Sequence, residues 1–189
     1  FDAANNSIIL YMMEGEDHRL YLGTDGSGLF VLDRDKIMPL PMPSASPSDQ
    51  RIAYLSKGLH HEIYIVTAGS RVWKYADNRV TALILPHLIH CITGILPDAE
   101  GGYYITGCEG CYYYSPDGKT TRILDAYCNN LLYISRDSML VSALNGLYLI
   151  GGPRTSRRIN FPGVDTCTFM SLRHLGKFYL LATANRGFI

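Results

Sequence analysis

The strongest candidate for metal or redox chemistry is the pair Cys108 and Cys111 in the sequence CEGC. Cysteines at this spacing bind zinc when two further ligands are supplied, usually by a second such pair or by histidines. The other cysteines, Cys91, Cys128 and Cys167, stand singly, and an odd total argues against a framework of disulfides. We therefore predict that CEGC contains reduced, structural cysteines, with a local disulfide as the alternative. We expect no metal and no cofactor.

The histidines are candidates for proton transfer or for contact with a ligand. Most of them fall in loops between strand-like segments, where we interpret them as solvated turn residues; these are His18, His60, His61 and His174. His87 and His90 lie in a longer connection. They could touch a ligand there, although the ordinary polarity of loops explains them equally well.

Nucleophilic catalysis has no support in the sequence. There is no G-x-S-x-G elbow and no assembled cysteine–histidine pair. The sequence GTDGSG, which starts at Gly23, lacks the lysine of a phosphate-binding loop and precedes a strand-like segment rather than a helix. The Ser-rich sequence PSASPSDQ, at residues 43–50, is interpreted as a flexible connection. We predict that this chain is not itself an enzyme.

Composition excludes several classes of protein. Of the 189 residues 47% are hydrophobic, and 17 basic residues balance 17 acidic ones. This is enough apolar material for a core, while the near-zero net charge gives no footprint for nucleic acid. No stretch approaches the roughly 18 apolar residues of a membrane-spanning helix. The chain begins with Phe1 and shows no charged segment of a signal peptide, and we expect it to be a piece of a longer protein.

One pattern recurs along the whole chain and predicts the architecture. An apolar run ends in a small residue, and a turn and a second apolar run follow, as in LYLGTDGSGLFVLD from Leu20 and IYIVTAGSRVWKYADN from Ile63. The aligned small residues are Thr24, Thr67, Gly107, Ala143 and Thr183. Their spacing of roughly 40 residues, without helical periodicity in between, is typical of four-stranded β-propeller blades.

In four of the five repeats the turn after the aligned residue carries a glycine, where a positive φ would exclude a side chain. These glycines are Gly28, Gly110, Gly146 and Gly187; the second repeat has Arg71 instead, which predicts a different turn. The repeats cover approximately residues 7–43, 51–86, 91–124, 131–162 and 167–189. We predict an all-β fold, namely about four and a half antiparallel blades of a larger propeller. A closed five-bladed ring is the alternative.

The predicted fold brings a set of polar residues to one face. Turns between second and third strands share a face of a propeller with the connections between blades. The candidate ligand-binding residues there are Asp25, Arg71, Glu109, Asn145 and Arg186 from turns, and His87, His90 and Tyr127 from connections. Carboxylates, amides and guanidinium groups bind hydroxyl pairs, so the set would suit a hydroxyl-rich ligand. The polarity of exposed turns explains it as well. Trp73 and the run Tyr112–Tyr114 are expected to pack in the core.

The first repeat resembles the two-component regulator propeller repeat. The residues that match that pattern are Gly23, Thr24, Gly26, Gly28, Leu29, Phe30 and Asp33. The third repeat keeps Gly107, Gly110 and Tyr112, and the later repeats keep less.

This resemblance implies a sensor: the periplasmic part of an inner-membrane hybrid histidine kinase that detects an oligosaccharide or another small ligand. It implies further blades and an immunoglobulin-like module in the same chain, and a homodimer in the full receptor. Ligand binding would rearrange the propellers, and kinase activity would belong to other parts of the protein. Two alternatives stay open. One is a propeller enzyme, such as a polysaccharide or antibiotic lyase, with Glu109, His87 and His90 as the candidate groups. The other is an interaction scaffold without a ligand.

Overall fold

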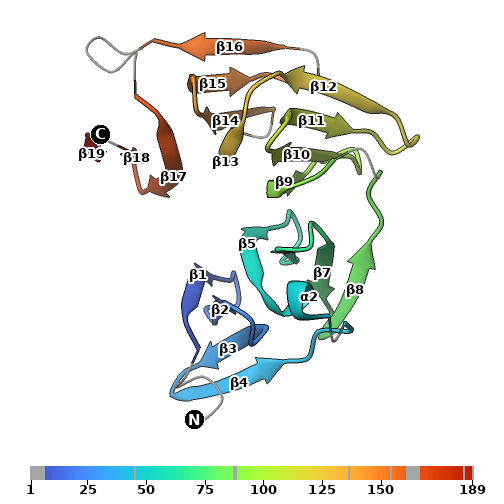
Figure 1. Cartoon of the computed structure of the whole chain (residues 1–189). Helices are drawn as coiled ribbons and strands as arrows, with labels where there is room; N and C mark the ends of the chain where they lie inside the picture. Colours follow the sequence, from blue (N-terminus) through green and yellow to red (C-terminus); the bar gives the residue numbers. More distant parts are fainter. Residues whose placement is uncertain are drawn as a thin grey trace. The chain divides into compact units, whose positions relative to one another are not determined.

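The computed structural model describes residues 7–44, 46–86, 89–135, 137–153, 155–160, 167–184 and 186–188. Their strands form five antiparallel sheets, each built from strands that are consecutive in the chain (Figure 1). Four sheets have four strands and the last has three. The chain is therefore an all-β protein made of propeller blades, as the repeats predict.

We number the sheets as blades 1 to 5. Blade 1 contains β1 (Ile9–Glu14), β2 (Leu20–Thr24), β3 (Leu29–Asp33) and β4 (Lys36–Leu40). Blade 2 contains β5 (Ile52–Lys57), β6 (Ile63–Thr67), β7 (Val72–Ala76) and β8 (Arg79–Leu83). Blade 3 contains β9 (Ile92–Pro97), β10 (Tyr103–Gly107), β11 (Gly110–Tyr114) and β12 (Thr120–Leu124). Blade 4 contains β13 (Cys128–Ser135), β14 (Ser138–Ala143), β15 (Gly146–Ile150) and β16 (Ser156–Ile159). Blade 5 contains β17 (Phe169–Leu175), β18 (Phe178–Thr183) and β19 (Gly187–Phe188).

The chain divides into two compact units, which are described separately. Unit 1 comprises Phe1–His87 with blades 1 and 2, and unit 2 comprises Leu88–Ile189 with blades 3 to 5. None of the helices in the described ranges is long and apolar enough to cross a membrane.

The repeat alignment is confirmed at the residue level. Each second strand ends at the small residue that the sequence aligns, from Thr24 in blade 1 to Thr183 in blade 5. The predicted glycines all have positive φ, for example 81° at Gly28, where a Cβ would lie 2.6 Å from the side-chain oxygen of Gln50. In blade 2 the positive φ moves to Ser70, at 56°, so the turn beside Arg71 differs from the others as expected.

Burial follows the order of the strands within a blade. All five residues of β6 are buried, and β2 and β10 are buried at every position except the first. A strand with neighbours on both faces reads as a continuous apolar run. The fourth strands β4 and β8 contain instead only exposed and partly buried residues.

The core of unit 1 joins its two blades. Tyr21, Leu29 and Val31 of blade 1 pack in one cluster with residues of blade 2, including Ile52 and Trp73. Trp73 is 7% exposed, which confirms that it is a core residue. In unit 2, Tyr112 and Tyr113 are likewise buried, and Tyr114 is partly buried.

A short helix lies in the connection between the two blades of unit 1. We expected a flexible connection at residues 43–50, so the helix corrects that expectation. Helix α2 (Pro47–Gln50) begins with a proline, which suits a first helical turn. The Asp49 carboxylate is only 1% exposed. It accepts hydrogen bonds from Ser44 Oγ at 2.5 Å, Thr67 Oγ1 at 3.1 Å and Arg71 Nη1 at 3.0 Å. A buried carboxylate requires such partners, and they fix this segment against β6.

A contact that we call the closing pair recurs in the blades. It joins the residue before the first strand to the residue after the second strand. Four blades make it as a backbone hydrogen bond, with N···O distances of 2.9 to 3.0 Å: Asp25 to Ile8, Ala68 to Arg51, Leu144 to Tyr127 and Ala184 to Thr168. The pair ties the ends of the first two strands together.

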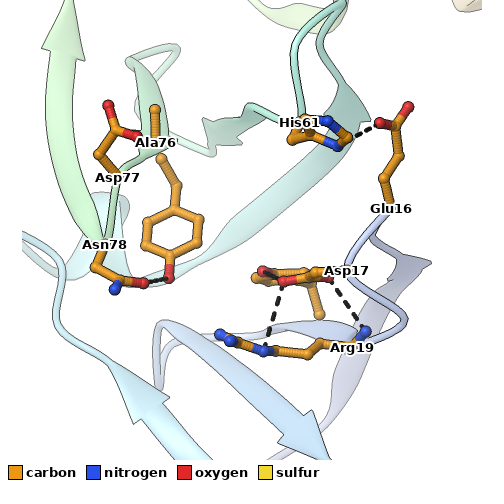
Figure 2. Close-up of a pocket in the computed structure, with 9 residues that line it drawn as sticks. Glu16, Asp17, Arg19, His61, Ala76, Asp77 and Asn78 are labelled. Carbon is orange, nitrogen blue, oxygen red and sulfur yellow. Dashed lines mark hydrogen bonds and ion pairs between the residues drawn. The ribbon is translucent and has the colours of Figure 1, made fainter.

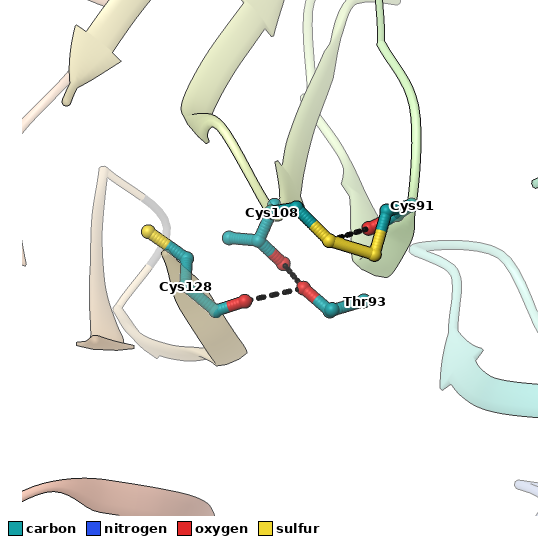
Figure 3. Close-up of a disulfide and its surroundings, with 5 residues drawn as sticks. Cys91, Thr93, Cys108 and Cys128 are labelled. Carbon is teal, nitrogen blue, oxygen red and sulfur yellow. Dashed lines mark hydrogen bonds between the residues drawn. A yellow bond between two sulfur atoms is a disulfide. The ribbon is translucent and has the colours of Figure 1, made fainter. Parts of the chain in front are cut away.

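Blade 3 has a disulfide at this position, between Cys91 and Cys108 (Figure 3). The two residues are 17 apart in sequence, with Cα atoms separated by 5.5 Å. The prediction that Cys108 is reduced is therefore wrong: its partner is not Cys111 but the distant Cys91. The prediction for Cys111 is correct, since it is free and buried on β11. Burial also raises the pKa of the Cys111 and Cys128 thiols, the latter to about 12.

A β-bulge lies beside every closing pair. The register of the first two strands shifts between Ile9 and Tyr11 in blade 1, and at the corresponding positions of the other blades. In unit 2 the extra residue links neighbouring blades. Thr93 Oγ1 donates to the Cys128 carbonyl at 2.6 Å, and Asn129 Nδ2 donates to the Phe169 carbonyl at 2.8 Å. Bulges can redirect a side chain in this way.

We predict that Cys91→Ser combined with Cys108→Ser destabilises unit 2 by about 3 kcal/mol, the entropy expected from opening a loop of this length. Iodoacetamide in denaturant should modify three thiols before reduction, namely those of Cys111, Cys128 and Cys167, and all five after it. Thermal melts of wild type with and without reductant, and of the double variant, measure the effect. An unchanged melting temperature, or five reactive thiols before reduction, would contradict it.

A second prediction concerns Asp49. Asp49→Ala leaves the groups of Ser44, Thr67 and Arg71 without their acceptor and should cost about 2–4 kcal/mol. Trp73 is the only tryptophan and lies in the unit 1 core, so its fluorescence during denaturation reports on this unit. Asp35→Ala, at an exposed turn, is the control and should cost less than about 0.5 kcal/mol. Equal losses in the two variants would disprove the assignment.

Candidate functional site

The structure distributes the predicted ligand-binding residues over both units. Asp25 and Arg71 belong to unit 1, whereas Glu109, Asn145, Arg186, His90 and Tyr127 belong to unit 2. His87 lies outside the described residues. The described members are exposed, and their role in binding stays a prediction.

Asp25 and Arg71 also have structural partners. Arg51 Nε lies 2.7 Å from Asp25 Oδ1, and a β-bridge pairs the same two residues. Arg71 is held by the buried Asp49, although its own side chain is 63% exposed. Both side chains therefore contribute to joining turns of unit 1, and the guanidinium of Arg71 keeps donors that face solvent.

Unit 2 brings four of its predicted residues together in two pairs. The disulfide joins the residues next to His90 and Glu109, so it brings the backbones of these two residues close to each other. The closing pair of blade 4 joins Tyr127 to Leu144, which precedes Asn145. Arg186 lies in the last turn, where its amide donates to Thr183 Oγ1 at 2.9 Å.

A pocket in unit 1 was missed by the sequence analysis. It has a volume of about 400 Å³ (Figure 2). Its lining comes from the β1–β2 and β5–β6 loops, from β2 and β7, and from the β7–β8 turn. The lining residues are Glu16, Asp17, Arg19, Tyr21, His61, Tyr75, Ala76, Asp77 and Asn78.

Asp17 organises the blade 1 side of the pocket. Its carboxylate accepts hydrogen bonds from the Tyr21 hydroxyl at 2.8 Å and from the Arg19 amide at 3.2 Å. The Arg19 guanidinium lies between two carboxylates, with Nε 3.5 Å from an oxygen of Asp17 and of Asp33. Burial and the bond to Asp17 together raise the pKa of Tyr21, which remains a neutral donor.

His61 connects the two blades across the pocket. Its Nδ1 lies 2.6 Å from Glu16 Oε2. The loop that presents His61 is fixed by Glu62, whose carboxylate accepts from the His60 amide at 2.7 Å and lies 3.1 Å from Lys74 Nζ. Burial acts to raise the pKa of Glu62, but these two contacts, together with the amide of Glu62 itself, outweigh it and the pKa is lowered.

The β7–β8 turn completes the pocket. Asp77 and Asn78 have φ of 49° and 58°, the left-handed pair that a two-residue hairpin turn requires. Asn78 Oδ1 accepts from the Tyr75 hydroxyl at 3.0 Å, which leaves the amide hydrogens of Asn78 available as donors. The rings of Tyr75 and Tyr21 are 6.0 Å apart, so the aromatic wall is continuous from blade 2 to blade 1.

The sequence contained a signal for this pocket. We placed ligands on the face formed by turns between second and third strands, and interpreted His61 as a solvated residue. The loops after first and third strands meet at the opposite edge of a blade, and they include Asp17 and the pair Asp77–Asn78. Polar residues in those loops are therefore equally good candidates for contact with a ligand.

No protein-family model matches the sequence, and no curated protein matches it. Solved structures do. Virginiamycin B lyase from Staphylococcus aureus is similar with a TM-score of 0.71 and 12% identity, over 94% of this chain and 67% of the lyase. The extracellular domain of a putative one component system from B. thetaiotaomicron is similar with a TM-score of 0.71 and 14% identity, over 94% of this chain and 25% of that domain. A GH74 enzyme of Niastella koreensis has a TM-score of 0.73 and 12% identity, over 95% of this chain and 33% of the enzyme.

These similarities define the class of fold, the β-propeller. The chain spans only a quarter of the extracellular domain and a third of the GH74 enzyme. A lyase, an extracellular domain of a putative one component system and a GH74 enzyme share this fold. The function of this chain therefore has to be argued from its residues.

Alkaline pH should destabilise the protein through its buried tyrosines. Burial raises the pKa of Tyr104 to about 12, and burial together with a bond to Asp98 raises that of Tyr113; Tyr21 behaves alike. An unfolded tyrosine loses its proton near pH 10, so between that pH and the higher folded pKa the unfolded chain binds fewer protons. The stability that these buried tyrosines contribute is therefore fully present below about pH 10 and falls as the pH rises further.

The measurement is denaturation between pH 8 and 11, with phenolate absorbance at 295 nm. Tyr21→Phe should reduce the steepness of the alkaline loss, because one linked proton is removed. A wild-type stability that does not change up to pH 11 would show that these hydroxyls are not protected.

Proposed function

We propose that the chain is the ligand-sensing, extracytoplasmic part of a two-component receptor, and that its ligand is an oligosaccharide. The observation that supports this most directly is the first repeat, which resembles the two-component regulator propeller pattern. Its matching residues have clear structural roles. Gly23 packs against β5, since a Cβ there would lie 2.6 Å from the Ile52 side chain. Thr24 closes the turn with a 2.7 Å bond to the Gly28 carbonyl.

The disulfide supports a location outside the cytoplasm. Disulfides form and persist in oxidising compartments such as the bacterial periplasm, and are rare in the cytosol. Cys91 and Cys108 join two strand ends of an otherwise complete blade, so the bond has the placement of a structural link. We therefore propose the periplasmic part of an inner-membrane protein.

Further blades of the same chain are part of this proposal. The chain aligns along almost its whole length with propellers that are longer than itself. We propose that additional blades, an immunoglobulin-like module and a second receptor copy complete the sensor. Kinase activity would then belong to other parts of the receptor.

Ligand contact is proposed at the polar face predicted from the sequence. The exposed guanidinium of Arg71 and the exposed carboxylate of Glu109 can each bind a pair of hydroxyl groups. Tyr127, which is 36% exposed, offers a ring. These groups have the chemistry that sugar recognition uses.

Calorimetry on the complete extracytoplasmic region should show binding of an oligosaccharide that Arg71→Ala and Glu109→Ala weaken by roughly tenfold each, since each removes a charge-assisted contact. Lys119→Ala, at an exposed turn of blade 3, is the matched control. Binding that stays within twofold in both variants would exclude this face. Cleavage of a polysaccharide, or of a streptogramin antibiotic, would favour an enzyme instead.

A further inference from the structure

The unit 1 pocket has a charge imbalance that its structural role does not require. Glu16, Asp17 and Asp77 contribute three carboxylates, whereas Arg19 contributes one guanidinium. Even with a proton on His61, the anionic groups outnumber the cationic ones. A ligand that enters this pocket therefore meets a negative potential.

The described lining excludes several ligand classes. An anion would face repulsion from the carboxylates. The described residues contain no group of three or more His, Cys, Asp or Glu side chains arranged to hold a metal ion. A purely apolar ligand would displace water from the exposed carboxylate oxygens and the Asn78 amide without replacing its hydrogen bonds, which is costly.

The polar groups of the pocket are held in place before any ligand binds. Tyr21 and the Arg19 amide orient Asp17, the Tyr75 hydroxyl orients Asn78, and His61 is paired with Glu16. Figure 2 shows these pairs on different sides of a common space. A preorganised site loses less conformational entropy on binding.

We propose that this pocket binds a small molecule that carries both an ammonium group and hydroxyl groups, of which an amino sugar is the simplest type. The carboxylates attract the ammonium group. The Asn78 amide donates hydrogen bonds to hydroxyl groups, and the carboxylate oxygens of Glu16 and Asp77 accept hydrogen bonds from them. The volume of about 400 Å³ lies within the usual range of small-ligand pockets. This goes beyond the proposed function, because it concerns a second site that does not depend on the polar face.

The test compares three sugars with the same ring and different charge: glucosamine, glucose and glucuronic acid. Each is titrated into the isotope-labelled chain at neutral pH and low salt, and binding is followed by NMR. Glucosamine should bind most tightly and shift the amide signals of His61, Asp77 and Asn78. Glucose should bind at least threefold more weakly, and glucuronic acid should not bind detectably.

Two variants test the charge directly. Asp77→Asn keeps a residue that accepts the left-handed backbone, and Glu16→Gln keeps the side-chain shape. Each should weaken glucosamine by about two- to fivefold, as for partly exposed ion pairs, and the double variant by roughly tenfold. Asp35→Asn is the matched control, since Asp35 lies in the corresponding turn of blade 1, outside this pocket, and it should leave the affinity unchanged.

The outcomes are decisive either way. Selective glucosamine binding that both pocket variants weaken, in proteins with wild-type melting temperatures, supports the site. Equal binding of glucose and glucosamine, shifts confined to residues outside the pocket, or no binding at 50 mM glucosamine overturns it. Weakening by Asp35→Asn to the same extent also overturns it, because the effect would then be one of overall charge.

Discussion

Each blade depends on the closing pair, the contact between the residue before its first strand and the residue after its second. Side chains alternate along a strand, so a slip by one residue would move every side chain to the opposite face of the sheet. The closing pair fixes the end of the first hairpin, and the bulge beside it adds local twist. β2, β6 and β10 are buried at almost every position, so in another register each of their side chains would meet different neighbours.

The position of the loops follows from the same constraint. With the first hairpin fixed, the loops after the first and third strands of a blade come to the edge opposite its closing pair. In unit 1 this brings Asp17 and Arg19 of blade 1 close to Asn78 of blade 2, around one pocket. At the closing-pair edge, Asp25 and Arg71 are drawn into ion pairs that connect turns. Both edges of unit 1 therefore contain ion pairs, but those at the edge opposite the closing pairs line a pocket.

Local features of the fold were predictable because they depend on backbone geometry. A residue with positive φ and a small residue at a strand end are visible in the sequence, as Gly28 and Thr24 show. The disulfide was not predicted, because we compared Cys108 with its near neighbour Cys111. These two residues lie in different environments: Cys111 is buried in blade 3, whereas Cys108 is part of the closing pair of that blade. The repeats place Cys91 before a first strand and Cys108 after a second strand, as they place Arg51 and Ala68 in blade 2, but no pattern in the sequence shows that these two positions are in contact. Helix α2 was not predicted for another reason. It is held by hydrogen bonds that Asp49 accepts from Thr67 and Arg71, which are distant in sequence, so no local pattern indicates them.

The closing pair also bears on how such a chain evolves. In four blades it uses only the backbone amide and carbonyl, and the residues that supply them share no chemical type: aspartate with isoleucine, alanine with arginine, leucine with tyrosine, alanine with threonine. The backbone contact by itself therefore does not require particular side chains at these positions. Such a contact can therefore persist while the side chains at its positions change. In blade 3 two cysteine side chains make the closing pair. Its loss in a relative would therefore be visible in the sequence, as the replacement of Cys91 or Cys108.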